Sequence, residues 1–174
     1  MIYFIRHGET NYNRKFQFQG HLDIPLNETG INQAKAALEY SKSLHLDKIY
    51  CSPLLRAKQT ADIINSHHKL SIIEDDRLKE IYMGSLQGRC FNDLSEDEQK
   101  YAFTKPEHFG GESHDELCLR VIEFFKEIEN SNEDILIVSH GGIYRAIQKY
   151  LNNYTSLQFD LKPLPNAEFT ILKQ

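Results

Sequence analysis

Five short segments rich in apolar residues have the length of β-strands. They cover residues 2–5, 48–51, 71–74, 135–138 and 167–172. The first and fourth are continuous apolar runs, which is typical of strands buried on both faces of a sheet. The last alternates only loosely and follows proline-rich punctuation, so we expect an edge strand there.

Helical periodicity fills the intervals between these strands. After residues 27–30, apolar residues recur at helical steps as far as Leu44, which predicts one amphipathic helix. Ser52 and Pro53 have the capping-residue and proline order of a second helix start. Further helices are expected over 113–129 and 142–151. Alternating strands and helices predict an α/β fold with a mainly parallel sheet covered on both faces.

Length and composition are those of one soluble globular unit. With 174 residues, 40% hydrophobic and 26% charged, we expect a single domain over residues 1–174. The three cysteines lack the spacing of a disulfide framework or zinc site, which favours a reducing cytoplasm. Neither a signal-peptide core nor a membrane span is expected, because no apolar run is long enough.

A net charge of −5 argues against a nucleic acid partner, which requires clustered basic residues. A small anionic ligand stays compatible with this charge, because a few arginines suffice to make a local positive pocket. The sequence leaves the oligomeric state open.

Two of the predicted strands end in a histidine beside glycine. The first runs into Arg6-His7-Gly8-Glu9-Thr10, and the fourth into His140-Gly141-Gly142. Neutral imidazole is a nucleophile, arginine offers forked donors to phosphate oxygens, and a helix N-terminus after His140 favours anions. Open α/β sheets bind ligands at this edge, so the pair predicts a phosphate site. The plainer alternative is two histidines that merely end buried strands.

Arg56 lies in the first turn of the second expected helix. The helix dipole disfavours a cation at this position unless an anion binds beside it. A solvated arginine is the alternative, since the cost at an exposed helix start is only about 0.3–1 kcal/mol.

Ordered motifs run along most of the chain. Besides residues 6–10, they are Gln19-Gly20, Asp23-Ile24-Pro25-Leu26, Thr29-Gly30 with Gln33-Ala34, Ser52-Pro53 with Arg56-Ala57 and Gln59-Thr60-Ala61, Leu78-Lys79-Glu80, Gly110-Gly111-Glu112-Ser113, and Ser139-His140-Gly141-Gly142. In this order the chain resembles the histidine phosphatase superfamily, also called phosphoglycerate mutase-like. Several ordered motifs are far more specific than one.

The resemblance implies a fold, a reaction and the residues that perform it. The fold would be a three-layer α/β/α arrangement with a mostly parallel central sheet and one antiparallel edge strand. His7 would become phosphorylated, Arg6, Arg56 and His140 would hold the phosphoryl oxygens, and Glu80 would protonate the leaving alcohol. Neither a metal nor a cofactor is implied. The same motifs imply further phosphate-binding residues: Asn13, Gln19, Gly20 and Gly141.

Hydrolysis of a small phosphorylated metabolite is the predicted activity. Residues 84–88 look closer to the phosphoglycerate mutases, but the interval 81–111 is short and holds Arg89 as its sole arginine, whereas mutases use an arginine pair there. A mutase or other phosphoryl transferase is therefore the first alternative, and a non-catalytic phospho-ligand binder the second. The substrate stays unnamed. Residues available to line its pocket are Lys15, Phe16, Phe18, Tyr82, Phe91 and Phe109.

Two other groups of residues are interpreted as structural. His67 and His68 are adjacent and lack a third ligand at metal-binding spacing, so we expect surface residues. Cys51 lacks a phosphate-cradling glycine loop and is interpreted as a small buried thiol.

Overall fold

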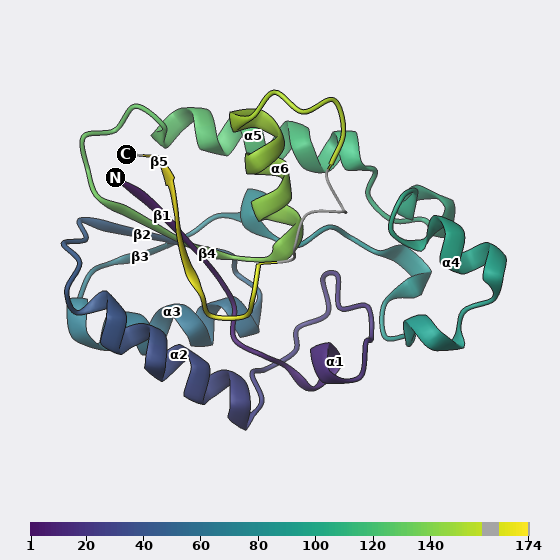
Figure 1. Cartoon of the computed structure of the whole chain (residues 1–174), viewed down its shortest axis with the longest axis horizontal. Coiled ribbons are helices and arrows are strands. Elements are labelled where there is room, and N and C mark those ends of the chain that lie inside the picture. Colours follow the sequence, from purple (N-terminus) through teal and green to yellow (C-terminus); the bar gives the residue numbers. More distant parts are fainter. Residues whose placement is uncertain (158–163, 174) are drawn as a thin grey trace.

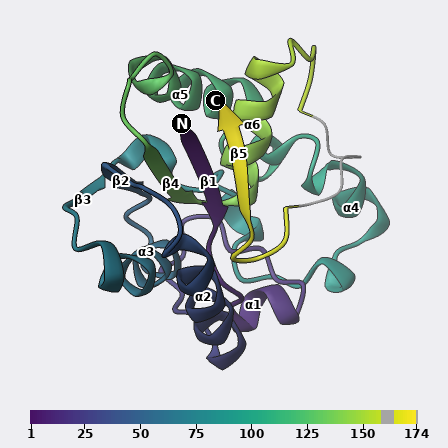
Figure 2. The ribbon, with the colours of Figure 1, turned by 60° about the vertical axis from the view of Figure 1, so that its left-hand side comes forward.

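A computed structural model describes residues 1–157 and 164–173 of the chain. Within these ranges one sheet has the order β3-β2-β4-β1-β5 (Figure 1). The strands are β1 (Ile2–Arg6), β2 (Lys48–Cys51), β3 (Ile72–Glu74), β4 (Ile135–Ser139) and β5 (Phe169–Lys173). Neighbouring strands are parallel except β5, which runs antiparallel to β1 at the edge (Figure 2). The predicted α/β fold, with its mostly parallel sheet and antiparallel edge strand, is confirmed.

Helices cover both faces of the sheet (Figures 1 and 2). One face carries α2 (Glu28–Ser41) and α3 (Leu55–His68), and the other carries α5 (His114–Ile128) and α6 (Gly141–Leu151). Two short helices lie outside these layers, α1 (Asn11–Arg14) and α4 (Glu96–Ala102). No helix of the described ranges has the length and hydropathy to cross a bilayer.

The alternation of side chains along the central strands divides the core in two. Phe4 and Ile137 pack with Phe124 of α5 on one face, whereas Ile5 and Val138 pack on the other face with apolar residues of α2 and α3. Successive strand residues point to opposite faces, so a strand between two helical layers must be apolar throughout. This requirement explains the continuous apolar runs in β1 and β4.

Two helix boundaries differ from the sequence prediction. Helix α2 ends at Ser41, so Leu44 lies beyond it in a turn. Helix α3 begins at Leu55 rather than at Ser52 and Pro53, and its cap comes from far along the chain, because the carboxylate of Asp23 accepts a hydrogen bond from the Leu55 amide at 2.7 Å. A helix capped by a distant residue has no local start signal.

A third apolar cluster lies apart from the sheet. Residues between β3 and α5 form short 3-10 turns and α4, and they enclose an apolar core of their own with Phe18. An isolated antiparallel bridge between Gln17 and Cys90 ties this region to the segment after α1. The sequence analysis did not predict α1, α4 or this cluster.

Close contact between two glycines fixes the loop after β1. A Cβ atom on Gly8 would collide with the backbone carbonyl of Gly30, and one on Gly30 would collide with the carbonyl of Glu9. The side chain of Asn27 caps α2 through the Gly30 amide at 2.8 Å and also donates to the Glu9 carboxylate at 2.7 Å. The N-terminus of α2 therefore supports the loop that follows His7.

Substitution of Gly30 tests this contact. We expect Gly30→Ala to lower the free energy of unfolding by about 2 kcal/mol, because the new methyl group meets rigid backbone. Chemical denaturation in urea measures the change. Asn32→Ala, at an exposed position of the same helix, is the control and should leave stability nearly unchanged. Equal stability of the two variants would contradict the interpretation.

Candidate active site

The register of two parallel strands brings the two predicted histidines together. Arg6 of β1 lies opposite Ser139 of β4, so the next residues, His7 and His140, leave the sheet side by side. Their ring centroids are 5.2 Å apart, and the side chains are almost fully buried, with exposures of 2% and 0%. The sheet edge therefore holds a buried histidine pair.

Hydrogen bonding assigns the tautomer of His7. Its Nδ1 lies 2.7 Å from the carbonyl oxygen of Gly8, which only accepts, so Nδ1 carries the hydrogen and Nε2 keeps its lone pair. Burial, and then the charges of Arg56 and Arg6, hold the pKa of His7 well below its ordinary value of 6.5. The ring is neutral near neutral pH and offers a nucleophilic nitrogen.

Two arginine side chains lie beside this pair. Arg56 is fully buried in the first turn of α3, and its terminal nitrogens donate to the carbonyls of Leu22 and Gly20, both at 2.9 Å. Arg6 donates through Nη1 to the carbonyl of Leu164 at 2.9 Å. Burial lowers the pKa of both guanidinium groups, that of Arg56 to about 10, so both stay charged near neutral pH.

Three buried nitrogens at this place have no hydrogen-bond partner within the described residues. They are Nε of Arg6, Nε of Arg56 and Nδ1 of His140. The Nε2 atom of His140 lies 2.7 Å from the hydroxyl of Ser52, and when that hydroxyl donates, Nδ1 carries a hydrogen. Buried donors without partners are costly, and an anion with several oxygens would satisfy them together.

A carboxylate completes the site. The Gly142 amide, in the first turn of α6, donates to both carboxylate oxygens of Glu80 at 3.1 and 3.3 Å, and the Ile81 amide donates to one at 2.9 Å. The Glu80 carbonyl lies 2.7 Å from Nε2 of His21 and accepts from Arg120 at 3.2 Å. Hydrogen bonds thus hold both the backbone and the side chain of Glu80.

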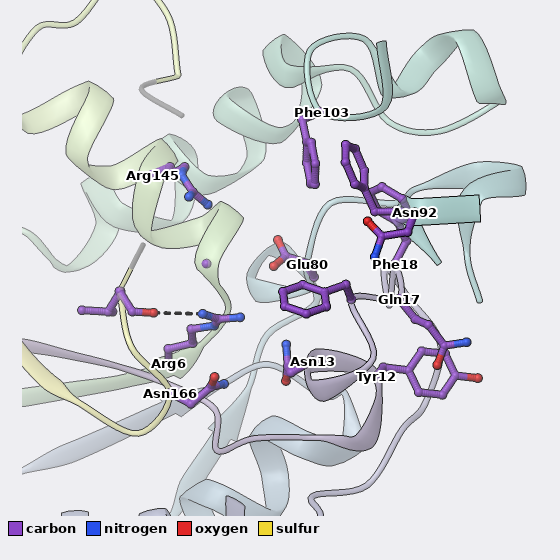
Figure 3. A pocket seen from close by; sticks show the side chains of 14 residues that line it. Arg6, Tyr12, Asn13, Gln17, Phe18, Glu80, Asn92, Phe103, Arg145 and Asn166 are labelled. Atoms are coloured by element: carbon purple, nitrogen blue, oxygen red, sulfur yellow. Dashed lines mark hydrogen bonds between the residues drawn. The ribbon is translucent and has the colours of Figure 1, made fainter. Parts of the chain in front are cut away.

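The site opens into a cavity of about 800 Å³ (Figure 3). Four of the predicted site residues line it, namely Arg6, Asn13, Glu80 and Gly141. His7, His140 and Arg56 are not in this lining. Because Arg6 and Gly141 are the chain neighbours of the two histidines, the cavity ends where the buried histidine pair begins.

Besides Arg56 and His140, the predicted phosphate-binding residues Gln19 and Gly20 also lie outside the cavity lining. Gln19 accepts a hydrogen bond from Thr10 at 3.0 Å, and the Gly20 carbonyl accepts from Arg56. Gly20 has a φ of 48°, and a Cβ there would collide with the Gln87 side chain. These contacts make Gln19 and Gly20 supports for the loop and for Arg56. Their direct contact with phosphate stays a prediction.

Half of the candidate substrate-pocket residues lie in the cavity wall. Phe16, Phe18 and Phe91 line it, whereas Lys15, Tyr82 and Phe109 do not. Lys15 and Tyr82 are exposed, and Phe109 packs against the third apolar cluster. Nothing in their local sequence distinguishes the two groups. The way in which the segment after α1 pairs with the segment after Glu80 decides which side chains face the cavity.

Several cavity residues were missed by the sequence analysis. They are Tyr12, Gln17, Asn92, Phe103, Arg145, Leu164 and Asn166. For Arg145 a signal existed, because it follows Gly141 by four positions and so shares its helix face. Asn166 donates to the His7 carbonyl at 2.8 Å from a segment that returns to the site only in the folded chain.

The remaining candidates have structural roles. No cluster of three or more metal-ligating side chains occurs within residues 1–157 and 164–173. His67 is exposed, and Nε2 of His68 lies 3.2 Å from the Ser41 hydroxyl. Cys51 is fully buried, and burial raises the pKa of its thiol, as expected for an unreactive thiol.

A neutral histidine, two guanidinium groups and a carboxylate thus lie together at one edge of the α/β sheet. A family profile described as histidine phosphatase superfamily (branch 1) matches residues 2–174. The chain belongs to this superfamily.

Similar proteins bear phosphatase and mutase names. The chain is 38% identical over 147 residues to the uncharacterized phosphatase PhoE of Bacillus subtilis, covering 82% of this chain and 72% of that one. It is 36% identical over 157 residues to a metal-independent phosphoserine phosphatase of Arabidopsis thaliana, covering 84% and 66%. A probable phosphoglycerate mutase, GpmB of Photorhabdus laumondii, is 34% identical over 148 residues, covering 80% and 69%.

Solved structures share the fold over nearly the whole chain. The structure of a mycobacterial glucosyl-3-phosphoglycerate phosphatase in complex with VO3 superposes with a TM-score of 0.87 at 30% identity, covering 97% of this chain and 90% of that one. The family and fold implied by the motifs are thereby confirmed.

The buried histidines predict an acid-sensitive fold. Their pKa values lie well below 6.5, mainly because of burial and secondly because of the positive charge of Arg56. Below pH 6.5 the unfolded chain therefore binds protons at these histidines that the folded chain does not bind. The free energy of unfolding should therefore fall as pH decreases below about 6.5, by at most about 1.4 kcal/mol per pH unit for each histidine.

Denaturation between pH 7 and 5, in buffer free of phosphate and sulfate, measures this slope. The double variant His7→Gln, His140→Gln should lose less stability over the same range. His67→Gln, which alters an exposed histidine, is the control and should keep the wild-type slope. Equal slopes for the wild type and the double variant would refute the assignment.

Proposed function

We propose that the protein is a metal-independent phosphomonoesterase that works through a phosphohistidine at His7. The proposal rests on three buried nitrogens that have no partner within the described residues, Nε of Arg6, Nε of Arg56 and Nδ1 of His140, which lie beside a neutral histidine. Two guanidinium groups supply the positive charge that a transferring phosphoryl group requires. The name of the Arabidopsis relative supports independence from metal.

The reaction proceeds in two displacements. Nε2 of His7 forms a bond to phosphorus as the ester P–O bond breaks, and the Glu80 carboxylic acid gives its proton to the leaving oxygen. In the second step a water oxygen attacks phosphorus, the P–N bond breaks, and the water proton returns to the Glu80 carboxylate. The products are the alcohol and inorganic phosphate. The first step uses Glu80 in its carboxylic acid form.

The ion pair between Arg89 and Glu98 favours hydrolysis over transfer of the phosphoryl group back to the product. This sole arginine of the interval 81–111 donates to the Glu98 carboxylate at 2.6 and 3.2 Å and does not line the cavity. A mutase must hold a phosphorylated acid for the return transfer, and Arg89 does not provide that contact. The substrate class is a small phosphorylated metabolite.

A reducing cytoplasm is the proposed location. Its support is that Cys51, Cys90 and Cys118 are all unpaired, two of them in the core.

Removal of the nucleophile tests the mechanism. His7→Ala should lower kcat by at least about a thousandfold, because no other group replaces Nε2. Substrate carrying a labelled phosphoryl group should leave acid-labile, alkali-stable label on the wild type and none on His7→Ala.

The exposed His67→Ala is the control and should keep both activity and label. Activity that survives His7→Ala would overturn the mechanism, and activity lost on chelation would overturn the claim of metal independence. The same assay distinguishes a mutase, which yields an isomerised phosphoester when a bisphosphorylated cofactor is added, from a phosphatase, which yields free phosphate. Tight vanadate binding without turnover on any ester would instead identify a non-catalytic binder.

Replacement of the acid should make the rate depend on the leaving group. Glu80→Gln keeps the shape of the side chain but cannot donate the proton, so kcat/KM for alkyl phosphates should fall by about 10²- to 10⁴-fold. The rate on p-nitrophenyl phosphate should fall far less, because p-nitrophenolate leaves without a proton. Glu123→Gln, at an exposed position of α5, is the control. Equal losses on both substrates would exclude Glu80 as the acid.

A further inference from the structure

The cavity has a wall of aromatic rings away from the phosphate site. Its aromatic residues come from two separated segments of the chain and are Tyr12, Phe16, Phe18, Phe91 and Phe103. Figure 3 shows Arg6 and Arg145 along one side of the cavity and Phe18 and Phe103 along another, with Glu80 between them. A phosphoester bound at Arg6 and protonated by Glu80 therefore directs its alcohol toward the rings.

Three of these rings form a rigid unit. The ring centroids of Phe18 and Phe103, and those of Phe91 and Phe103, are 5.3 Å apart, and those of Phe18 and Phe91 are 6.2 Å apart. Phe18 is buried in the third apolar cluster, whereas Phe103 is 47% exposed. The inner part of the unit is fixed by packing, and the outer ring is left uncovered in the cavity wall.

Phe16 presents a further ring, held by its backbone. Its φ of 54° lies in the left-handed region, which is unfavourable for a residue with a bulky side chain. Two hydrogen bonds hold it there, from the Phe16 amide to the Asn13 carbonyl at 3.1 Å and from the Phe91 amide to the Phe16 carbonyl at 2.9 Å. The side chain is nonetheless 70% exposed. A ligand that covers it removes apolar surface from water.

The chemistry of the wall indicates what it binds. Among the described residues that line the cavity, Glu80 is the only carboxylate, so the aromatic wall itself carries no charge. Several rings in mutual contact favour a flat partner over a merely apolar one, because offset and edge-to-face ring pairs add to the gain from burial. A cavity of about 800 Å³ also exceeds the needs of a three-carbon ester.

We propose that the alcohol of the preferred substrate carries a planar aromatic ring, which packs against Phe103 and Phe16. This inference rests on the proposed phosphatase function and specifies the substrate class of the same site. Phe16 and Phe103 are the residues that determine specificity.

The test compares esters of similar leaving-group strength. We use 2-phenylethyl, 2-cyclohexylethyl and n-propyl phosphate and measure kcat/KM for each. The wild type should prefer the phenylethyl ester to the propyl ester by about tenfold or more, and the cyclohexyl ester should fall between them. Phe16→Ala and Phe103→Leu should each reduce the ratio of kcat/KM for the phenylethyl ester to that for the propyl ester severalfold.

Leu119→Ala is the matched control, because Leu119 is an apolar side chain on α5 that is 73% exposed and does not line the cavity. It should keep the wild-type ratios. Equal kcat/KM for the phenylethyl and propyl esters, or a preference untouched in both phenylalanine variants, would overturn the inference. Equal kcat/KM for the cyclohexylethyl and phenylethyl esters would show selection for apolar bulk and overturn the requirement for a planar ring.

Failure of the proposed function would look different. If no ester is hydrolysed, the phosphatase proposal fails, and calorimetric binding of 2-phenylethylphosphonate and n-propylphosphonate then decides the inference alone. Tighter binding of the phenyl compound, lost in Phe16→Ala, supports it, and equal binding overturns it.

Discussion

One fully buried guanidinium group, that of Arg56, and one partly buried group, that of Arg6, lie next to two neutral imidazoles, and much of the fold serves this arrangement. Transfer of a cation from water to a protein interior is costly unless dipoles or counter-charges replace the lost hydration. Carbonyls of Gly20 and Leu22 do so for Arg56, and the Leu164 carbonyl does so for Arg6. Within the described residues, the Nε donors of both arginines are left without partners. These fixed donors have the preorganisation that an anion with several oxygens requires.

The same cations set the chemistry of the histidines. A proton on His7 would be a third positive charge in a buried space, so its Nε2 lone pair stays available. The Gly8 carbonyl directs the ring so that this nitrogen, rather than Nδ1, is free. Binding of the anion and availability of the nucleophile thus have one common cause. The Glu80 carboxylate is held separately, by the backbone amides of Ile81 and Gly142 rather than by Arg6 or Arg56.

The sequence was informative where one physical requirement acts on consecutive residues. Buried parallel strands must be apolar, and ligand residues follow them at the sheet edge, so β1, β4, His7 and His140 were all predictable. It was uninformative where a distant contact decides: Asp23 caps α3, and the bridge from Gln17 to Cys90 brings Phe16 and Phe91 together. No periodicity records such pairings. The comparisons establish the family and the fold, while the residue roles rest on geometry.

The third apolar cluster has a consequence for how this protein diversifies. Phe18, Met83, Leu86, Leu94 and Ala102 pack among themselves, and Ile81 packs both against them and against the sheet cluster that contains Phe124. Mutational changes that do not contact Ile81 are expected to add to changes in the sheet core, because sites without shared partners act independently. Substitutions in residues 86–103 can therefore diversify the aromatic wall of the cavity with little change in the geometry of the buried histidine pair.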